Sequence, residues 1–138
     1  MKNIERTETE KIVSQKIRVG QNDFRQALLK SLKQCPITHI NEKRLLIASH
    51  IKPWVYCDNS ERLDVNNGFL LSPLFDKLFD KSVGLITFTP QKEILISNKL
   101  TKDNIQRLGI VHRQVIDDLP VSGREEFLEY HRRYIFQG

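Results

Sequence analysis

The stretches RLLIASHIKPW at residues 44–54 and NNGFLLSPLFDKLFD at residues 66–80 decide the fold. Residues 44–51 are almost continuously apolar up to the histidine, which predicts a buried strand. GFLLS at residues 68–72 predicts a second strand that returns beside it. Pro73 suits the first turn of a helix, because its missing N–H needs no partner there. The expected order is strand, loop, strand and helix.

Around this centre, other segments show their own periodicity. Residues 22–34 carry apolar side chains at helical spacing and end before Pro36, which predicts a helix. The largely apolar segments 85–88 and 93–96 flank a turn at 89–92 and predict a β-hairpin that extends the central sheet or packs on it. Two more helices are expected downstream, at 101–108 and at 122–136.

The last of these predicted helices has two features of note. Ser122 precedes Glu125 at the spacing of a capping box, which predicts its first turn. Its arginines, Arg124, Arg132 and Arg133, form either a phosphate-binding face or a solvated face paired with neighbouring glutamates.

Composition limits the class of protein. The chain has 138 residues, a formal net charge of +5 and two cysteines. We expect a charged lead-in or linker over 1–15 and a single domain over 16–138. No apolar run approaches 18 residues and the N-terminus is not a secretory signal, so we expect a cytoplasmic protein without a membrane span. Two widely separated cysteines favour neither a disulfide nor structural zinc. The positive charge favours a polyanionic partner without proving one.

Four polar side chains in the central stretch suit phosphodiester hydrolysis: His50, Asn67, Asp76 and Asp80. A neutral imidazole takes a proton from water, and a divalent cation neutralises charge on the phosphate. Residues four apart lie on one face of a helix, so Asp76 and Asp80 can face a common centre. Carboxylates alone favour Mg²⁺ or Mn²⁺ over zinc. The amide of Asn67 can brace a loop or orient a ring.

Each of these residues also has a plainer interpretation. A lone histidine in an apolar run is more often a buried structural residue than a base. Asp76 and Asp80 can be solvated residues on a helix that packs through its leucines and phenylalanines. Asn67-Gly68 alone is best explained as a turn. Only the combination of all four in this order favours catalysis.

The ordered motifs resemble the HNH endonucleases, which have a ββα-metal core, and in particular a restriction-endonuclease-like branch with an Ala-Ser-His-Ile-Lys-Pro-Trp type run at 48–54. The resemblance covers about residues 16–136. It implies an α+β fold in which flanking N- and C-terminal helices and an added β-hairpin surround the ββα-metal core. Two positions depart from the pattern: Ser49 stands where many superfamily members have an Asp or His metal ligand, and His39 stands where the branch commonly has Gly.

Carried over to this chain, the resemblance implies His50 as general base, Asn67 as the central asparagine, Asp76 as a metal ligand and Asp80 as a second one. Plausible DNA contacts are Lys52, Arg62 and Lys77. We therefore expect an endonuclease that uses one Mg²⁺ or Mn²⁺ ion on double-stranded DNA, restriction-type or a catalytic domain of such an enzyme, with a homodimer as the analogous assembly. The alternatives are a non-cleaving DNA-binding module on the same fold and a nuclease of RNA or single strands.

Overall fold

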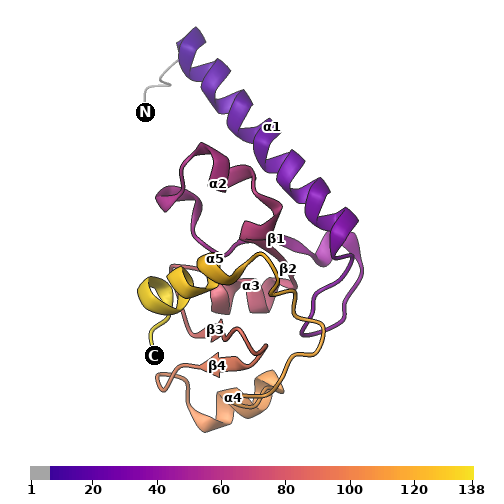
Figure 1. The fold of residues 1–138 in the computed structure, drawn as a ribbon, viewed down its shortest axis with the longest axis vertical. Helices are drawn as coiled ribbons and strands as arrows, with labels where there is room; N and C mark the ends of the chain where they lie inside the picture. Colours follow the sequence, from indigo (N-terminus) through magenta and orange to yellow (C-terminus); the bar gives the residue numbers. More distant parts are fainter. Residues whose placement is uncertain (1–6) are drawn as a thin grey trace, which may run out of the picture.

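Helix α1 (Glu8–Ser31) is the first element of the computed structural model, which describes residues 7–138. Thr7 accepts from the Glu10 N–H, and the Glu10 carboxylate accepts from the Thr7 N–H, so a capping box begins the helix. The prediction that this helix starts at residue 22 is wrong, because residues 8–15 of the predicted lead-in are helical. Residues 1–6 of that lead-in lie outside the described residues. Figure 1 shows the N-terminal half of α1 extending past the rest of the fold.

The predicted strand pair is present. Strands β1 (Ile47–His50) and β2 (Gly68–Leu71) form an antiparallel sheet in which His50 lies opposite Gly68. The first strand is shorter than expected, because residues 43–45 form a 3₁₀ turn, η1 (Lys43–Leu45). Every residue of β2 is buried, which explains why its sequence is continuously apolar instead of alternating.

Helix α3 (Pro73–Phe79) follows β2 directly and begins at the predicted proline. It buries Phe75, Leu78 and Phe79 against the rest of the core. The helix ends before Asp80, whose backbone is extended (ψ 151°). The i, i+4 prediction placed Asp76 and Asp80 on one helix, and this is wrong because Asp80 lies just beyond its end.

The connection between the two strands holds more structure than the loop that was predicted. It contains the 3₁₀ turns η2 (Trp54–Tyr56) and η3 (Val65–Asn67) and the short helix α2 (Asn59–Leu63) between them. Asp58 and Glu61 form a capping box at the start of α2. This signal was present in the sequence, but a five-residue helix lacks the repeated apolar spacing by which helices are recognised.

The downstream β-hairpin is formed as predicted by β3 (Ile86–Phe88) and β4 (Ile94–Ile96). It makes a second two-stranded sheet and does not extend the first one. Helix α4 (Lys102–Leu108) follows with Thr101 as its N-cap, in agreement with the predicted helix at 101–108. Figure 1 shows β3 and β4 between α3 and α4.

The last helical segment differs from its prediction. Helix α5 (Glu125–Tyr130) continues into a π-helical turn, η4 (His131–Ile135). Ser122 does not cap it, because Gly123 (φ +79°) and Arg124 separate the serine from the first turn. Neither predicted role fits Arg124, which is buried and donates to the carbonyl oxygens of Gly68 and Val65.

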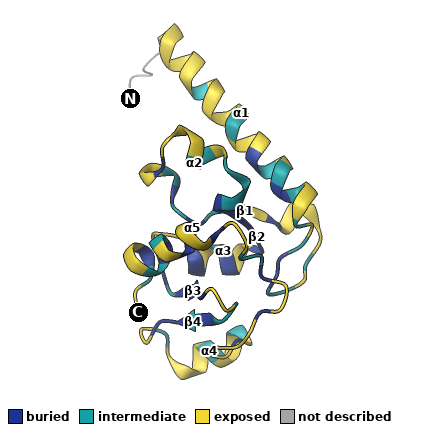
Figure 2. Cartoon of the chain, in the orientation of Figure 1, coloured by how far each residue is buried: buried dark blue, intermediate teal, exposed yellow. Residues whose placement is uncertain are grey.

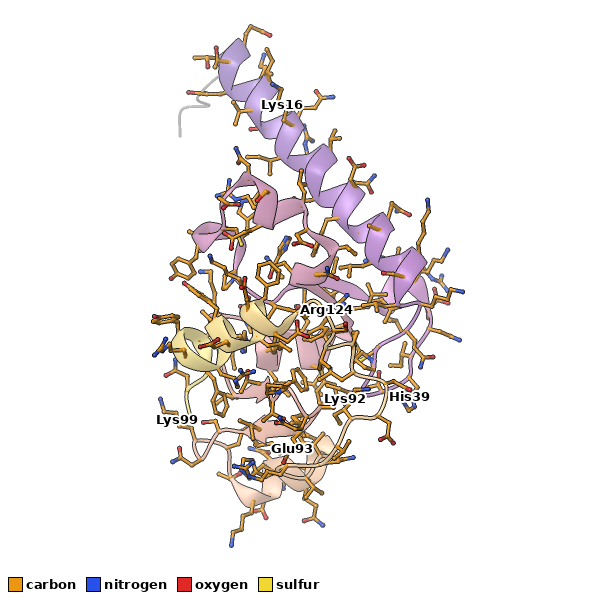
Figure 3. The ribbon with its side chains drawn as sticks, in the orientation of Figure 1. Lys16, His39, Lys92, Glu93, Lys99 and Arg124 are labelled. Atoms are coloured by element: carbon orange, nitrogen blue, oxygen red, sulfur yellow. The ribbon has the colours of Figure 1, made fainter. Side chains whose placement is uncertain are left out.

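The buried side chains of α1, both sheets, α3 and α5 make one continuous apolar cluster, which Figure 2 shows as dark blue at the centre of the α+β fold. Both cysteines, Cys35 and Cys57, are buried and free. None of the helices in the part of the chain that the structure describes is long and apolar enough to cross a membrane.

Candidate active site

A pocket of about 350 Å³ opens where the end of β1, the turn after it, the end of α3 and the start of η4 meet. It brings together residues that are far apart in the sequence. Its polar and aromatic lining includes Ser49, His50, Trp54, Asp76, Asp80 and His131. Three of the four predicted reactive side chains, His50, Asp76 and Asp80, therefore line the same pocket.

The imidazole of His50 is held in one orientation by three contacts. Its Nε2 lies 2.8 Å from the carbonyl oxygen of Arg62. The ring stacks on Phe24 of α1, with centroids 3.9 Å apart, and meets the edge of Trp54 at 5.6 Å. A carbonyl oxygen only accepts hydrogen bonds, so Nε2 carries the proton and donates it. The Arg62 carbonyl is available because α2 ends at Leu63, leaving it without a helical partner.

The other ring nitrogen of His50 is accessible to solvent. Within residues 7–138, Nδ1 has no hydrogen-bond partner, whereas every fully buried side-chain nitrogen or oxygen there has one, so Nδ1 is reached by solvent. Burial lowers the pKa of His50, and this effect outweighs the hydrogen bond to the Arg62 carbonyl, which raises it. The ring is therefore neutral near pH 7, with a free lone pair on Nδ1. This is the state that a general base requires.

Ser49 orients the carboxylate of Asp76. The Ser49 hydroxyl donates to Oδ1 of Asp76 in a short hydrogen bond, and Ser49 itself is buried. Burial raises the pKa of Asp76, the nearby charge of Asp80 acts in the same direction, and the Ser49 hydrogen bond opposes both. The serine thus holds a carboxylate in place from a position where many superfamily members carry a metal ligand.

The carboxylate of Asp80 is tied to the turn that follows α3. It accepts from the backbone N–H and the hydroxyl of Ser82. Burial alone would raise the pKa of Asp80, but these hydrogen bonds, with the Lys81 backbone and Lys77, lower it below its usual value. Asp80 is therefore ionised at neutral pH on the rim of the pocket.

Asn67 is completely buried beneath the connection between the strands. Its Oδ1 accepts from the Lys52 N–H at 2.8 Å, and its Nδ2 donates to the Lys52 and Glu61 carbonyls and to Cys57 Sγ. These bonds join both ends of the connection, so its side chain supports the loop that carries Arg62, and it does not line the pocket.

The three predicted DNA contacts occupy different surroundings. Lys52 forms an ion pair with Glu61 at 2.9 Å. Arg62 stacks on Trp54, with its guanidinium 4.8 Å from the ring, and donates to the Trp54 carbonyl. Lys77 is exposed and reaches the Ser82 hydroxyl at 3.3 Å. Among these three, Lys77 alone forms neither an ion pair nor a ring contact within the described residues.

Two residues that shape the pocket were not identified as part of a site. Phe24 was recognised only as a core residue of a helix, and no pattern in the sequence connects it to His50. His131 is buried in the pocket wall and stacks on Phe79 with centroids 3.8 Å apart. Its Nδ1 accepts from the Thr87 hydroxyl, and Nε2 donates to the Phe79 carbonyl.

The donor set of the pocket fits a hard divalent cation. Within residues 7–138, no ion pair involves Asp76 or Asp80, although both line one pocket and Asp76 is half-buried. No group of three His, Cys, Asp or Glu side chains placed to hold a metal ion occurs in that range. Mg²⁺ typically uses one or two protein carboxylates and takes its other ligands from water and phosphate. Two carboxylates match that demand.

Comparison with known proteins finds one similarity, over the middle of the chain. Residues 35–89 match a family model described as HNH endonuclease, and this range contains both strands of the first sheet, all of α3 and the polar residues of the pocket except His131. No curated protein matches the chain significantly. The pocket and its surrounding elements thus coincide with the matched range. Residues 35–89 of this chain are thus similar in sequence to the HNH endonucleases.

Proposed function

We propose that this protein is a metal-dependent endonuclease that hydrolyses phosphodiester bonds in double-stranded DNA, as a restriction-type enzyme or its catalytic domain. In this proposal β1, β2 and α3 are the ββα-metal core. The observation that carries it is the state of His50, which is a neutral imidazole with Nε2 fixed and Nδ1 accessible to solvent, in a residue that lines the same pocket as Asp76. The family match to a nuclease over residues 35–89 supports the same reaction.

In the proposed reaction, Nδ1 of His50 takes a proton from a water molecule as the water oxygen attacks phosphorus. The bond from phosphorus to the 3′ oxygen breaks, and that oxygen leaves in line with the incoming water and is protonated by solvent. The Nε2–H bond to Arg62 stabilises the imidazolium that forms, because the carbonyl oxygen faces the charged ring. Asn67 keeps the Arg62 segment in position.

Asp76 and Asp80 would hold the divalent cation, with Mg²⁺ or Mn²⁺ as the expected ion. When bound, the ion supplies neutralisation of charge on the phosphate and the leaving oxygen. Ser49 keeps Asp76 turned toward this position. Lys52, Arg62 and Lys77 are proposed phosphate contacts, of which Lys77 is the most accessible.

Cleavage of both strands calls for two such sites, so a homodimer belongs to the proposal.

The test of function is incubation with supercoiled plasmid in Mg²⁺, Mn²⁺ or EDTA. We expect nicked or linear product that requires metal and is lost in His50→Ala and Asp76→Asn. His112→Ala and Asp103→Asn serve as matched controls, because both lie outside the pocket and should leave cleavage intact. Metal-dependent cleavage that survives His50→Ala would contradict the proposal.

A non-cleaving DNA-binding module is the second candidate, and it is favoured by one observation. Ser49 occupies the position at which many superfamily members have a metal ligand, and its hydroxyl donates a hydrogen bond to Asp76. The two candidates differ in metal binding, since a purely binding module has no need of it. Calorimetric titration with Mn²⁺ that gives the same heat for the wild type and Asp76→Asn would favour the second candidate.

A further inference from the structure

Three tyrosines contact one another on the surface beside the pocket. The rings of Tyr56 and Tyr130 have centroids 6.3 Å apart, and those of Tyr130 and Tyr134 are 4.8 Å apart. Tyr56 is 53% exposed and Tyr134 is 63% exposed. Large exposed aromatic residues that gather in one place mark a binding surface more often than single ones do. We call these three residues the tyrosine surface.

Two of the three tyrosines adjoin, along the chain, residues that line the candidate active site. Tyr56 follows Val55, which lines the pocket, and Tyr130 precedes His131, which lines it from the other side. Both segments that carry the tyrosines are therefore walls of the same pocket. His131, the first residue of η4, stacks on Phe79 at the end of α3, the helix that supplies Asp76.

Cations accompany the rings. The Lys52 ammonium lies 5.0 Å from the centroid of Tyr130, and the Arg133 guanidinium lies 6.0 Å from that of Tyr134. Lys52 is also paired with Glu61, whereas Arg133 forms no ion pair within the described range 7–138. Aromatic rings that alternate with cations are the composition of surfaces that bind single-stranded nucleic acid, where rings stack on bases and cations track phosphates.

We propose that the tyrosine surface stacks on an unpaired nucleobase of the strand whose phosphate enters the pocket. The idea rests on the proposed function. Within a regular duplex the faces of each base are covered by its neighbours, so an aromatic ring can stack only on a base that is unpaired or turned out of the helix. The favoured substrate is consequently DNA with an unpaired base near the cleaved bond, as in a bubble or an overhang.

The test measures binding in EDTA, so that cleavage does not interfere. A duplex oligonucleotide and the same duplex with a short unpaired bubble each carry 2-aminopurine, a fluorescent base whose emission changes on stacking. We expect the wild type to bind the bubble more tightly and to change its emission. Tyr134→Leu should weaken bubble binding by about fivefold or more and abolish the emission change, while Tyr134→Phe keeps both. Tyr134 is exposed, so its replacement should leave the thermal midpoint unchanged, which a melt checks.

Equal affinity of the wild type for bubble and duplex would overturn the proposal, as would equal losses in Tyr134→Leu and Tyr134→Phe. A change of sedimentation in Tyr134→Leu, with unchanged DNA binding, would instead identify an interface between copies and also overturn it. The plasmid assay separates the two ideas. Cleavage without ring-dependent bubble binding rejects the tyrosine surface alone, and ring-dependent binding without any cleavage rejects the nuclease alone.

Discussion

The protonation state of His50 depends on one backbone carbonyl and two aromatic rings. The Arg62 carbonyl fixes the tautomer, and Phe24 and Trp54 cover the ring so that burial lowers its pKa. The orientation of the Asp76 carboxylate depends on the hydroxyl of Ser49, which donates to its Oδ1. At the scale of the residue, each proposed reactive group therefore depends on named neighbours, and replacing one neighbour tests its share.

Phe24 provides the first test. Because burial lowers the pKa of His50 below its usual 6.5, the acid limb of kcat/KM should lie below pH 6.5 in the wild type. Phe24→Leu removes the stacked ring and admits water, so the limb should move to higher pH. Profiles of cleavage rate against pH measure this. Leu28→Val, one turn along α1, is the control, and a limb that stays in place in Phe24→Leu would refute the role of the ring.

Ser49 provides the second test at this scale. Ser49→Ala leaves Asp76 without its hydroxyl donor, and groups that orient a metal ligand are typically worth about 10- to 100-fold in affinity or activity. We expect Mn²⁺ affinity, measured by calorimetry, and plasmid cleavage to fall together by about tenfold or more. Ser49→Thr keeps a hydroxyl and should retain most of both. Unchanged Mn²⁺ affinity in Ser49→Ala would show that the hydrogen bond is merely structural.

At the scale of elements, the site depends on how closely α1 approaches the first sheet. Phe24 and Leu28 pack over β2 at Gly68, where a Cβ atom would lie 2.4 Å from the Phe24 ring and 2.8 Å from Leu28. The backbone there is extended (φ −145°), so the glycine is needed for space and not for its conformational freedom. This contact also brings the Phe24 ring onto His50, the residue opposite Gly68 in the sheet.

Gly68→Ala should therefore loosen α1 from the sheet. Overpacking of a core typically costs about 1–3 kcal/mol, and we expect a loss of that size in the free energy of unfolding measured with urea. Catalytic rate should fall as well, since Phe24 moves with the helix. Gly20→Ala is the comparison, because its added Cβ meets only the flexible end of Leu63 at 3.1 Å. Equal free energies of unfolding for Gly68→Ala and Gly20→Ala would show that α1 can shift away from the sheet without loss of stability.

At the scale of the whole molecule, the C-terminal segment joins both sheets to α3. Arg124 donates to the Gly68 carbonyl at the start of β2. His131 accepts from Thr87 of β3 and donates to the carbonyl of Phe79 in α3, at 2.7 Å in each case. Burial lowers the pKa of His131 to about 4, because a charged ring would lose its solvation there. Neutral His131 is thus part of what holds the pocket wall in place.

Because His131 makes these contacts as a neutral ring, we expect the free energy of unfolding to fall in acid. The pKa of His131 is lower in the folded chain than its unfolded value of 6.5, so the unfolded state binds the proton first. Its contribution to stability should be complete above pH 6.5 and should be lost as pH falls through 4, by about 3 kcal/mol in all. Urea unfolding at several pH values measures this loss. His131→Gln keeps a donor and an acceptor but does not titrate, so its stability should vary less over that window; an equal dependence on pH would assign the effect to other groups.

Local patterns sufficed where short-range rules apply. Apolar runs and turn residues predicted the pair of strands and the hairpin at β3 and β4, and Pro73 predicted the start of α3. The errors lie at helix ends. The capping box of Thr7 and Glu10 begins α1 earlier than the apolar spacing indicates. At α5, Gly123 keeps Ser122 from acting as the N-cap.

The sequence by itself determined the order of strand, strand and helix, the resemblance to the HNH endonucleases, and the four polar residues offered as a site. Periodicity and motif order depend on neighbours along the chain, so they can be found without coordinates. Only the tertiary structure decided that Phe24 stacks on His50, that Ser49 holds Asp76, that Asn67 lies beneath the loop, and that Arg124 is buried. These contacts join residues from separate elements, and the packing of the core is what brings them together.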